Sequence, residues 1–425
     1  MTTTVPNSCD IAVIGAGAAG LMAGLFAART SPKQRVVVVD GARIIGAKIL
    51  VAGGGRCNVT HEKVDEQQYA GTSRPAIRNV LRRFDVPQTI DFFASLGVQL
   101  KREETGKLFP VTDEARTVLD ALTGALHDAG ATLVHPWRVN TISANSGGGF
   151  TITRDHERDQ SGPAGASFTA RRVILATGGM ALPRTGSDGA GYAIAKSLGH
   201  ETSPRIFPAL VPLLLEKGHW LTELSGLTLP ATMEVRLSSG KRVQQFTNST
   251  LLTHFGLSGP AVLDISRYLG HARASDSGAG LFINWLPGMD REKLDAAVLK
   301  AGNISIARAL TQLGLPERFG RALCESRAVE PGALCSQLHR TPRLALVDSV
   351  VSMHVPIAGD RGFTYAEVTA GGVPLNEVHL ATMESRICPG LHLCGEVLDV
   401  DGRVGGFNFQ WAWASGWVAG TSAAT

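Results

Sequence analysis

The stretch CDIAVIGAGAAG, residues 9–20, decides the fold of this chain. Its first six residues predict a short apolar strand, and the glycines that follow have the GxGxxG spacing before an apolar helix over 21–29. Gly15 permits the turn, Gly17 lets the backbone approach a pyrophosphate, and Gly20 allows close helix–strand packing. The start of the helix offers unpaired N–H groups and a partial positive charge to phosphates.

A second predicted strand, Val36–Val39, ends in an acidic residue, Asp40. Asp40 can accept a hydrogen bond from a ribose 2′-OH, and its negative charge would repel a 2′-phosphate there. A lone GxGxxG motif is weak evidence. The strand before it, the helix after it and the acid at the end of the next strand together predict a dinucleotide-binding fold.

Composition excludes several classes of protein. The chain has 425 residues, of which 49 are glycine, about 12% against a usual ~7%, and the glycines fall in short clusters without a collagen period. A disordered, fibrous or disulfide-stapled protein is therefore excluded, and two or three domains are expected. The net charge of +4 is too small to indicate a nucleic-acid or membrane partner by itself. Six cysteines without a CxxC pair suggest reduced thiols and a cytoplasmic location.

Residues 11–28 are uncharged and could be mistaken for a signal peptide or a membrane span. No basic region precedes them, and the glycine spacing explains them better as a nucleotide-binding turn and helix. We therefore expect no membrane partner. Histidines, cysteines and carboxylates do not cluster with ligand spacing, so we expect no metal site.

The rest of the chain suggests one domain built from both ends and interrupted by another. A helix over 113–129 is followed by a predicted β-meander, with strands over 138–143, 150–154 and 167–170. A further strand over 172–176 then leads into Thr177-Gly178-Gly179. We assign residues 1–200 and 350–425 to the first domain and residues 201–349, β-rich and then helical, to the inserted one.

A β-meander leading into a strand and the sequence ATGG resembles the glutathione-reductase-type FAD domain. A second segment fits the same fold: Gly395-Glu396 follows a short strand, and Asp399, Gly405 and Gly406 precede the last helix. The N-terminus of that helix would stabilise negative charge on the N1–C2=O edge of a reduced flavin. Only one GxGxxG motif occurs, so a dedicated nicotinamide domain is not expected.

Residues 46–58, GAKILVAGGGRCN, resemble the GxKxxxSGGGRCN signature of a bacterial NAD(P)/FAD-dependent oxidoreductase family that includes BaiN-type and aminoacetone-oxidase-type members. Matching segments at 176–192, 252–260, 369–373 and 395–416 follow in the same order and span nearly the whole chain. Ala52 departs from the usual serine, which removes a hydroxyl group at that position. The long linker at 146–166 is a second departure.

The resemblance implies non-covalently bound FAD and an α/β fold in which a Rossmann-like FAD-binding domain is interrupted by a β-barrel-plus-helices insert. Together with the motifs, it implies a set of residues that contact the cofactor. These are Gly15, Gly17, Ala18, Ala19, Gly20, Asp40, Gly41, Lys48, Gly53, Gly54, Gly55, Arg56, Cys57, Asn58, Ala176, Thr177, Gly178, Gly179, Gly371, Gly372, Gly395, Glu396, Asp399, Gly405, Gly406, Phe407 and Asn408.

Three residues are candidates for a catalytic role, each with an alternative. Arg56 either holds an anionic substrate group or braces its loop, beside three glycines whose N–H groups could form an anion-binding nest. Cys57 is either a redox partner of the flavin or a small buried residue. His254 is either a proton donor or base or a structural histidine. In the same motif, Ser258 and Pro260 suit the N-cap and the first turn of a helix.

The function expected is two-electron hydride transfer by an FAD-dependent oxidoreductase acting on a small organic substrate. It is either a reductase that takes hydride from transiently bound NAD(P)H and passes it to an activated C=C bond, or an oxidase or dehydrogenase of an amine or alcohol. One alternative is an RNA-modifying flavoprotein, to which the basic helix at 74–83 could contribute, although no nucleic acid is expected. The other is a flavin-binding redox sensor without turnover.

Overall fold

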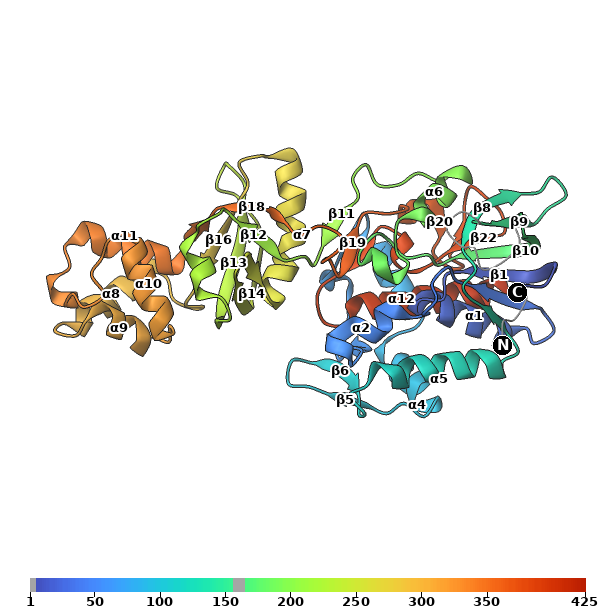
Figure 1. The fold of residues 1–425 in the computed structure, drawn as a ribbon, viewed down its shortest axis with the longest axis horizontal. Helices are drawn as coiled ribbons and strands as arrows, with labels where there is room; N and C mark the ends of the chain where they lie inside the picture. The colour runs from blue at the N-terminus through green and yellow to red at the C-terminus, as the bar shows by residue number, and fades with distance from the viewer. Residues whose placement is uncertain (1–4, 156–164) are drawn as a thin grey trace. The chain divides into compact units, whose positions relative to one another are not determined.

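The computed structural model describes residues 5–155 and 165–425, which fall into two compact units. Unit 1 contains the described residues up to Pro208 together with Glu367–Thr425, and unit 2 is Ala209–Ala366. Both ends of the chain thus build unit 1, as the blue and red ribbons in Figure 1 show. Part of the linker predicted at 146–166 lies outside the described residues.

Unit 1 is a mixed α/β unit. Its strands are β1 Ser8–Ile14, β2 Val36–Val39, β3 Thr60–His61, β4 Tyr69–Gly71, β5 Leu100–Arg102, β6 Lys107–Pro110, β7 Thr132–Val134, β8 Val139–Ala144, β9 Phe150–Arg154, β10 Ser167–Leu175, β11 Phe207–Ala209 (whose last residue belongs to unit 2), β19 Val368–Ala370, β20 Val378–His379, β21 Glu384–Ser385, β22 Leu391–Leu393 and β23 Val400–Gly402. Its α-helices are α1 Ala18–Thr30, α2 Ala47–Gly55, α3 Arg74–Leu81, α4 Val86–Ser95, α5 Ala115–Asp128, α6 Ala190–Ser197 and α12 Phe407–Ala423.

The main sheet of unit 1 has the strand order β20-β21-β22-β10-β1-β2-β7, and the pairs from β22 to β7 are parallel. In the centre of this sheet, Ile11 pairs with Arg172 of β10 on one side and with Val36 of β2 on the other. All four residues of β2 are buried valines, as expected for a parallel strand covered on both faces. The predicted Rossmann-like α/β fold is therefore confirmed.

The predicted β-meander is also present. β8 pairs with β9, and β9 pairs with β10, both antiparallel. The two strands expected at 167–170 and 172–176 are one continuous strand, β10, because the same residues that close the meander continue into the parallel sheet beside β1.

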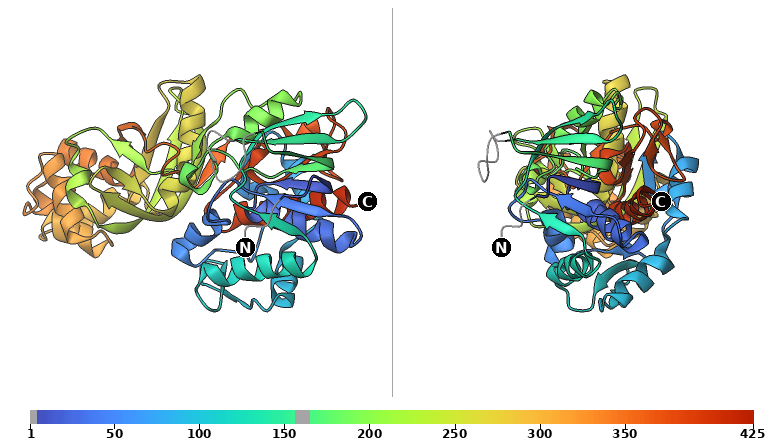
Figure 2. Two further views of the ribbon diagram at one scale, coloured as in Figure 1. Left: turned by 45° about the vertical axis from the view of Figure 1, so that its right-hand side comes forward. Right: turned by 90° about the vertical axis from the view of Figure 1, so that its right-hand side faces the viewer.

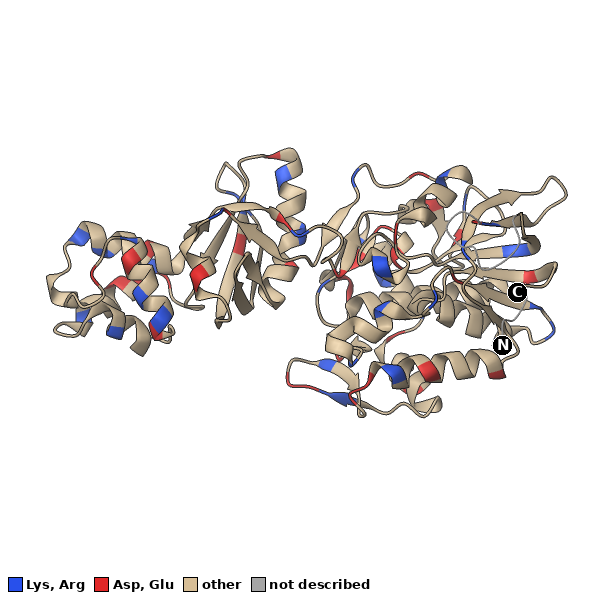
Figure 3. Cartoon of the chain, in the orientation of Figure 1, with Lys and Arg blue, Asp and Glu red and all other residues tan. Residues whose placement is uncertain are grey.

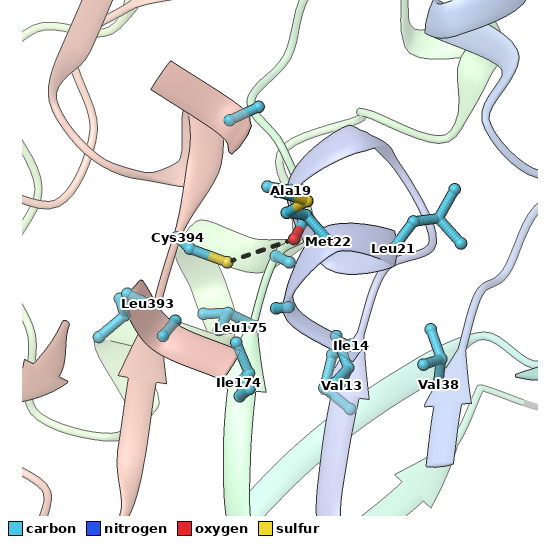
Figure 4. Close-up of a cluster of buried hydrophobic side chains, with 14 of the residues drawn as sticks. Val13, Ile14, Ala19, Leu21, Met22, Val38, Ile174, Leu175, Leu393 and Cys394 are labelled. Carbon is cyan, nitrogen blue, oxygen red and sulfur yellow. Dashed lines mark hydrogen bonds between the residues drawn. The ribbon is translucent and has the colours of Figure 1, made fainter. Parts of the chain in front are cut away.

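Helices α1 and α12, from opposite ends of the chain, pack side by side against this sheet, where the blue and red helices adjoin in Figures 1 and 2. A Cβ atom at Gly416 would lie 2.5 Å from the carbonyl oxygen of Ala19, and one at Gly420 would lie 2.2 Å from that of Ala23. The two glycines thus let the helix backbones approach. The Cys394 Sγ atom reaches the same carbonyl oxygen of Ala19 at 4.0 Å from the buried end of β22 (Figure 4).

Unit 2 combines one sheet with a group of helices. Its strands are β12 Leu213–Leu215, β13 Thr228–Arg236, β14 Arg242–Thr253, β15 Gly256–Ser258, β16 Gly280–Asn284, β17 Met353–Val355 and β18 Ile357–Asp360. Its α-helices are α7 Pro260–Ser275, α8 Arg291–Ala301, α9 Ile306–Gln312, α10 Glu317–Ser326 and α11 Arg340–Val351. The strand order is β17-β16-β13-β14-β15-β12-β18, and unit 2 has its own hydrophobic core.

The borders of the insert differ from those expected. We predicted residues 201–349, whereas the compact unit is Ala209–Ala366. The short strands β17 and β18 follow α11 and pair with β16 and β12, so the chain completes this sheet before it returns to unit 1. The described pairings do not join β17 to β18, which a closed sheet of this order would need, so the barrel stays a prediction.

Charged residues of both signs are scattered over the ribbons of both units (Figure 3). Among the helices in the described ranges, none combines the length and the apolar character needed to cross a membrane.

Candidate functional site

The loop between β1 and α1 is shaped by close backbone contacts. Gly15 has φ +107°, and a Cβ atom there would lie 2.5 Å from the carbonyl oxygen of Ala176. A Cβ atom at Gly20 would lie 1.8 Å from the carbonyl oxygen of Gly15. Gly17, the N-cap of α1, differs because no atom lies within 4 Å of the position that its Cβ would occupy. Gly15 and Gly20 are therefore required by packing, whereas Gly17 faces open space at a helix N-terminus, where a phosphate group fits.

Asp40 holds this loop from the end of β2. Its two carboxylate oxygens accept hydrogen bonds from the N–H of Ala16 at 2.6 Å and from that of Ala42 at 2.7 Å. Burial is the largest influence on this carboxyl and raises its pKa, against the lowering effect of both hydrogen bonds. Because a carboxylate has about four acceptor positions, a ribose hydroxyl could still donate to it. The next residue, Gly41, leaves room for the side chain of Arg138 at 3.0 Å.

The ATGG segment after β10 packs against the segment around Thr369. The Thr369 hydroxyl oxygen accepts hydrogen bonds from the N–H groups of Met180 at 2.7 Å and Ala181 at 3.0 Å. A Cβ atom at Gly179 would lie 2.4 Å from the same hydroxyl oxygen, and Gly178 has φ +72°. The two glycine-rich segments, far apart in the sequence, therefore meet where the backbone of one contacts the Thr369 hydroxyl of the other.

Glu396 joins this arrangement to α2. One of its carboxylate oxygens lies 2.7 Å from Nζ of Lys48, and the other accepts the N–H of Thr369 at 3.0 Å. The side chains of Lys48 and Glu396 are 24% and 19% exposed, so water only partly screens this ion pair. Two predicted cofactor-binding residues thus form a single charged pair beside the ATGG segment.

Two hydroxyl groups near this pair are buried without a hydrogen-bond partner among the described residues. They are Oγ1 of Thr177 and the phenol oxygen of Tyr192, at the start of α6. Burial, assisted by the negative charges of Glu396 and Asp399, raises the pKa of Tyr192, so the phenol is a hydrogen-bond donor. Unpaired buried hydroxyls cost free energy unless another molecule supplies partners. Together with the open space at Gly17, they fit a bound dinucleotide.

The GGGRC segment at the end of α2 has an unusual backbone. Gly53, Gly54 and Gly55 have φ values of +58°, +70° and +88°, so three left-handed residues follow one another. All three glycines are exposed, and Cys57 has φ +62°. Only glycine adopts such a run readily, which explains the motif, and the exposed backbone is able to face a ligand.

Arg56 braces this segment. Its guanidinium lies 2.6 Å from a carboxylate oxygen of Glu103 and 3.6 Å from one of Asp113, and its Cζ is 4.1 Å from the ring centre of Phe109. The guanidinium Nε also donates to the carbonyl oxygen of Gly53 at 3.4 Å. Of the two roles considered for Arg56, the described contacts favour the brace.

Cys57 lies inside unit 1 with no exposed surface. Burial raises the pKa of its thiol to about 12. A reactive cysteine needs the thiolate form, which neighbouring positive charge favours. Of the two roles considered, the burial favours the small packed residue over the redox partner.

The N-terminus of α12 is built from the last glycine pair. Gly406, the N-cap, has φ +90°, and a Cβ atom there would lie 2.7 Å from the backbone of Thr60. The N–H of Gly406 donates to the side-chain oxygen of Asn58 at 3.0 Å, in the amide orientation that also satisfies its nitrogen. The ring of Phe407 stacks on His61, with ring centres 5.0 Å apart. The helix start expected for the flavin edge is thus present and tied to the GGGRC segment.

Further predicted cofactor residues make close contacts within unit 1. A Cβ atom at Gly371 would lie 2.5 Å from the carbonyl oxygen of Arg205, and one at Gly395 would lie 2.7 Å from Ala19. Asp399 accepts a hydrogen bond from the hydroxyl of Thr72 at 2.7 Å. Asn408 uses its side-chain amide on the backbone of Gly402, at 2.7 and 3.0 Å, so this amide supports the fold.

His254 belongs to unit 2. It is exposed on the turn between β14 and β15, with its ring edge-on to Phe255 at 5.1 Å. The cap predicted in the same motif is wrong at one position. Gly259, with φ +90°, is the N-cap of α7 and Ser258 ends β15, while Pro260 begins the helix as expected. Gly259 takes this place because a Cβ atom there would lie 2.9 Å from the backbone of Leu251.

Within residues 5–155 and 165–425, no group of three or more His, Cys, Asp or Glu side chains could hold a metal ion. Sequence reasoning missed the hydroxyls of Tyr192 and Thr369 as polar groups of the site. The sequence places Thr369 just before Gly371-Gly372 and Tyr192 just after Asp188-Gly189, but it does not predict the direction of either hydroxyl group.

Comparison with known proteins agrees with this geometry. Residues 9–422 match the HI0933-like protein Rossmann domain family, and the chain belongs to that family. It is 36% identical over 419 residues to a 3-dehydro-bile acid delta(4,6)-reductase of Clostridium scindens, with 97% of this chain and 98% of that protein covered. It is 33% identical over 412 residues to the ribosomal RNA dihydrouridine synthase of Escherichia coli, with 96% of each protein covered.

A solved structure shows the same fold. The 3-ketosteroid delta1-dehydrogenase of Sterolibacterium denitrificans matches 99% of this chain and 100% of its own with a TM-score of 0.52, at 13% identity. The predicted family, the flavin-dependent oxidoreductase class and the assignment as an enzyme are confirmed. The expectation of no nucleic-acid partner stays a prediction, which the rRNA-modifying relative weakens.

Proposed function

We propose that this member of the HI0933-like family binds FAD and reduces a carbon–carbon double bond conjugated to a carbonyl group. The observation that carries the proposal is that two relatives with different substrates, each aligned over nearly the whole chain, both have hydrogen-adding activities in their names. One is a delta(4,6)-reductase of a 3-dehydro bile acid, and the other makes dihydrouridine. In both substrates the double bond is conjugated to a carbonyl group.

Different residues of unit 1 would contact different parts of the cofactor. The open backbone at Gly17 and the start of α1 would hold the pyrophosphate, and Asp40 would accept from the adenosine ribose. The start of α12 would face the flavin edge, and the unpaired hydroxyls of Thr177 and Tyr192 would donate to the cofactor. Bound FAD would supply the two-electron hydride chemistry.

The protein's own contribution is electrostatic and positional. The partial positive charge at the N-terminus of α12 would stabilise the negative charge of the reduced flavin edge. The Lys48–Glu396 pair, whose carboxylate accepts the N–H of Thr369, would keep the ATGG segment and residues 369–372 at a fixed spacing. With one GxGxxG motif in the chain, the nicotinamide donor would bind only transiently.

The test is an anaerobic titration of the flavin-loaded protein with NADH and NADPH, followed by flavin absorbance. We expect one nucleotide to bleach the flavin, and a 3-oxo steroid with conjugated double bonds or a uridine-containing rRNA fragment to restore its colour without oxygen. Absence of a flavin spectrum after added FAD would contradict the cofactor. Bleaching by amines or alcohols, with reoxidation only by oxygen, would instead make the protein an oxidase.

A further inference from the structure

An open pocket lies on one face of the unit 2 sheet, at the end of the β13–β14 hairpin. Its volume is about 510 Å³, which is within the range of small-molecule sites. The residues that line it come from β13, β14, β16 and β17, which are neighbours in the strand order, and from the turns beside them. All of them belong to unit 2, so the pocket is complete within that unit.

The strand register brings the side chains of this pocket together. Arg236 pairs with Arg242 of β14 and with Gly280 of β16. Two residues further along β16, Phe282 pairs with His354 of β17. Directly paired residues share one face of a sheet, and the residues that alternate with them on β13 and β16 are buried in the core of unit 2. The pocket therefore lies on the face of the sheet that is turned away from this core.

Gly280 gives the pocket its shape. A Cβ atom at Gly280 would lie 2.8 Å from Nε2 of His354 and 3.4 Å from the ring of Phe282. The ring centres of Phe282 and His354 are 5.1 Å apart, and Cζ of Arg236 lies 4.4 Å from the ring centre of Phe282. Because residue 280 has no side chain, an imidazole and a guanidinium can both approach the same aromatic ring.

The pocket has more positive than negative charge. Glu234 neutralises Arg236, because its two carboxylate oxygens accept from that guanidinium at 2.8 and 3.1 Å. Arg242 is exposed, and its guanidinium donates to the neutral amide oxygen of Gln245 at 3.0 Å. Among the residues that the structure describes, no carboxylate forms an ion pair with Arg242. Like charges directly opposite each other in a sheet are unfavourable, so an anion beside Arg242 would be stabilising.

The rim of the pocket is held in place by an acid next to it. Asp276 accepts the N–H and the hydroxyl of Ser238 at 2.7 and 2.9 Å, and it accepts the N–H of Gly278 at 3.0 Å. The bonds from Ser238 are the largest influence on this carboxyl and lower its pKa. Ser238 and Gly278, which both line the pocket, are thus joined through Asp276.

We propose that this pocket binds the phosphate group of a small organic phosphate. The guanidinium of Arg242 would form charge-assisted hydrogen bonds to the phosphate, and its planar fork matches the geometry of phosphate oxygens. The imidazole of His354 would donate a further hydrogen bond from the other side of the pocket. A phosphate group fills only part of about 510 Å³, and the rest of the pocket would hold the organic part of the ligand.

The test is a calorimetric titration of the FAD-loaded protein with AMP, ribose 5-phosphate and inorganic phosphate. Loading with FAD keeps AMP away from the GxGxxG site of unit 1. We expect R242Q to weaken AMP binding at least tenfold and H354A about fivefold, the values of a charge-assisted and of a neutral hydrogen bond. The matched control is R308Q, which removes one charge from an exposed arginine of α9 outside the pocket and should leave AMP affinity unchanged.

The outcomes identify the ligand or overturn the site. Tighter binding of AMP or ribose 5-phosphate than of inorganic phosphate, lost in R242Q, would support an organic phosphate. Equal affinity for all three probes, lost in R242Q, would support the phosphate contacts and identify free phosphate as the ligand. The inference is overturned if the wild type binds none of the probes, or if R242Q and H354A bind them as R308Q does. The proposed function can fail without changing this result, because these variants leave unit 1 unaltered and can be compared without FAD.

Discussion

The candidate flavin site of unit 1 is formed by backbone, whereas a group of stacked side chains in unit 2, Arg361 between the rings of Phe255 and Tyr365, is formed by side chains. In unit 1 the backbone forms the site: Gly17 leaves open space at a helix N-terminus, and Gly53–Gly55 expose a left-handed turn. In unit 2 the contact is between side chains, with Cζ of Arg361 3.4 Å from the ring centre of Tyr365. A site formed by backbone requires residues without a side chain, whereas a group of stacked side chains requires particular side chains.

This difference determines which site the sequence discloses. A Cβ atom at Gly20 would lie 1.8 Å from a carbonyl oxygen, so almost any other residue is excluded and the glycine marks the site in the sequence. Arg361 and Tyr365 are common surface residues, and the ring that completes the stack, Phe255, lies on another strand connection. Nothing in their local sequence indicates that they meet.

The largest effect is expected at Gly20. The change Gly20→Ala places a methyl group within 1.8 Å of the carbonyl oxygen of Gly15, in a loop packed on the buried Ala176. Backbone must move on both sides, so we expect a loss of more than about 4 kcal/mol in the free energy of unfolding. Thermal unfolding followed by circular dichroism measures it, and a midpoint within a few degrees of wild type would contradict the packing role.

Gly17 provides a test that separates cofactor binding from packing, because packing does not require a glycine at this position. Gly17→Ala meets no atom within 4 Å, and its φ of −80° and ψ of −171° suit alanine. The apoprotein should therefore melt as wild type does. Flavin affinity should fall by about 100-fold or more, because the methyl group would take the place of the pyrophosphate.

A matched glycine in unit 2 provides the control for this variant. Gly359 also has open space around its Cβ position, so Gly359→Ala should leave both melting and flavin affinity unchanged. Equilibrium titration of each apoprotein with FAD, followed by flavin fluorescence, measures the affinity. If Gly17→Ala binds FAD as tightly as Gly359→Ala, the open space at Gly17 is not the phosphate site.

Smaller effects are expected from buried hydroxyls. Thr177→Val and Tyr192→Phe remove oxygens that have no partner among the described residues, so the apoprotein should not lose stability. If FAD supplies the partner, each change should weaken flavin binding about 5- to 10-fold, the value of one hydrogen bond.

The same experiment has a control in unit 2. The hydroxyl of Thr250 is also buried without a partner among the described residues, and Thr250→Val should not alter flavin binding. If all three variants bound FAD with the same affinity, the unpaired hydroxyls of unit 1 would be features of packing and would not be contacts to the cofactor.

Much of the fold could be predicted because local patterns determine it. The strands at 9–14 and 36–39 and the terminal helix follow from apolar runs and glycine spacing. Helix α1 begins at Ala18 because Gly17 caps it, earlier than the apolar run alone indicates. The insert ends later than expected because β17 and β18, only three and four residues long, belong to the sheet of unit 2 by pairings that no local pattern shows.

The site was less predictable where its residues are determined by distant partners. Whether Arg56 binds a substrate or braces its loop could not be predicted, because its partner Glu103 lies 47 positions away in the sequence. In the structure the two side chains are 2.6 Å apart. The unpaired hydroxyls of Thr177 and Tyr192 result from the packing around them, which the sequence does not specify. The backbone positions of the site could be predicted from the sequence because they require glycine. The partners of the side chains are known only from the structure.

The smallest effect is expected at the buried thiols, where the two units behave alike. Burial raises the pKa of Cys57 in unit 1 and of Cys324 in unit 2 to about 12 in each case. Both thiols are then protonated at pH 8, so neither cysteine should react with iodoacetamide until the protein unfolds. Cys57→Ala and Cys324→Ala should each change the rate of flavin reduction less than twofold, as stopped-flow absorbance would show. A redox partner of the flavin at Cys57 would instead require a slowing confined to Cys57→Ala, and this would put a reactive side chain into a site that is otherwise built from backbone.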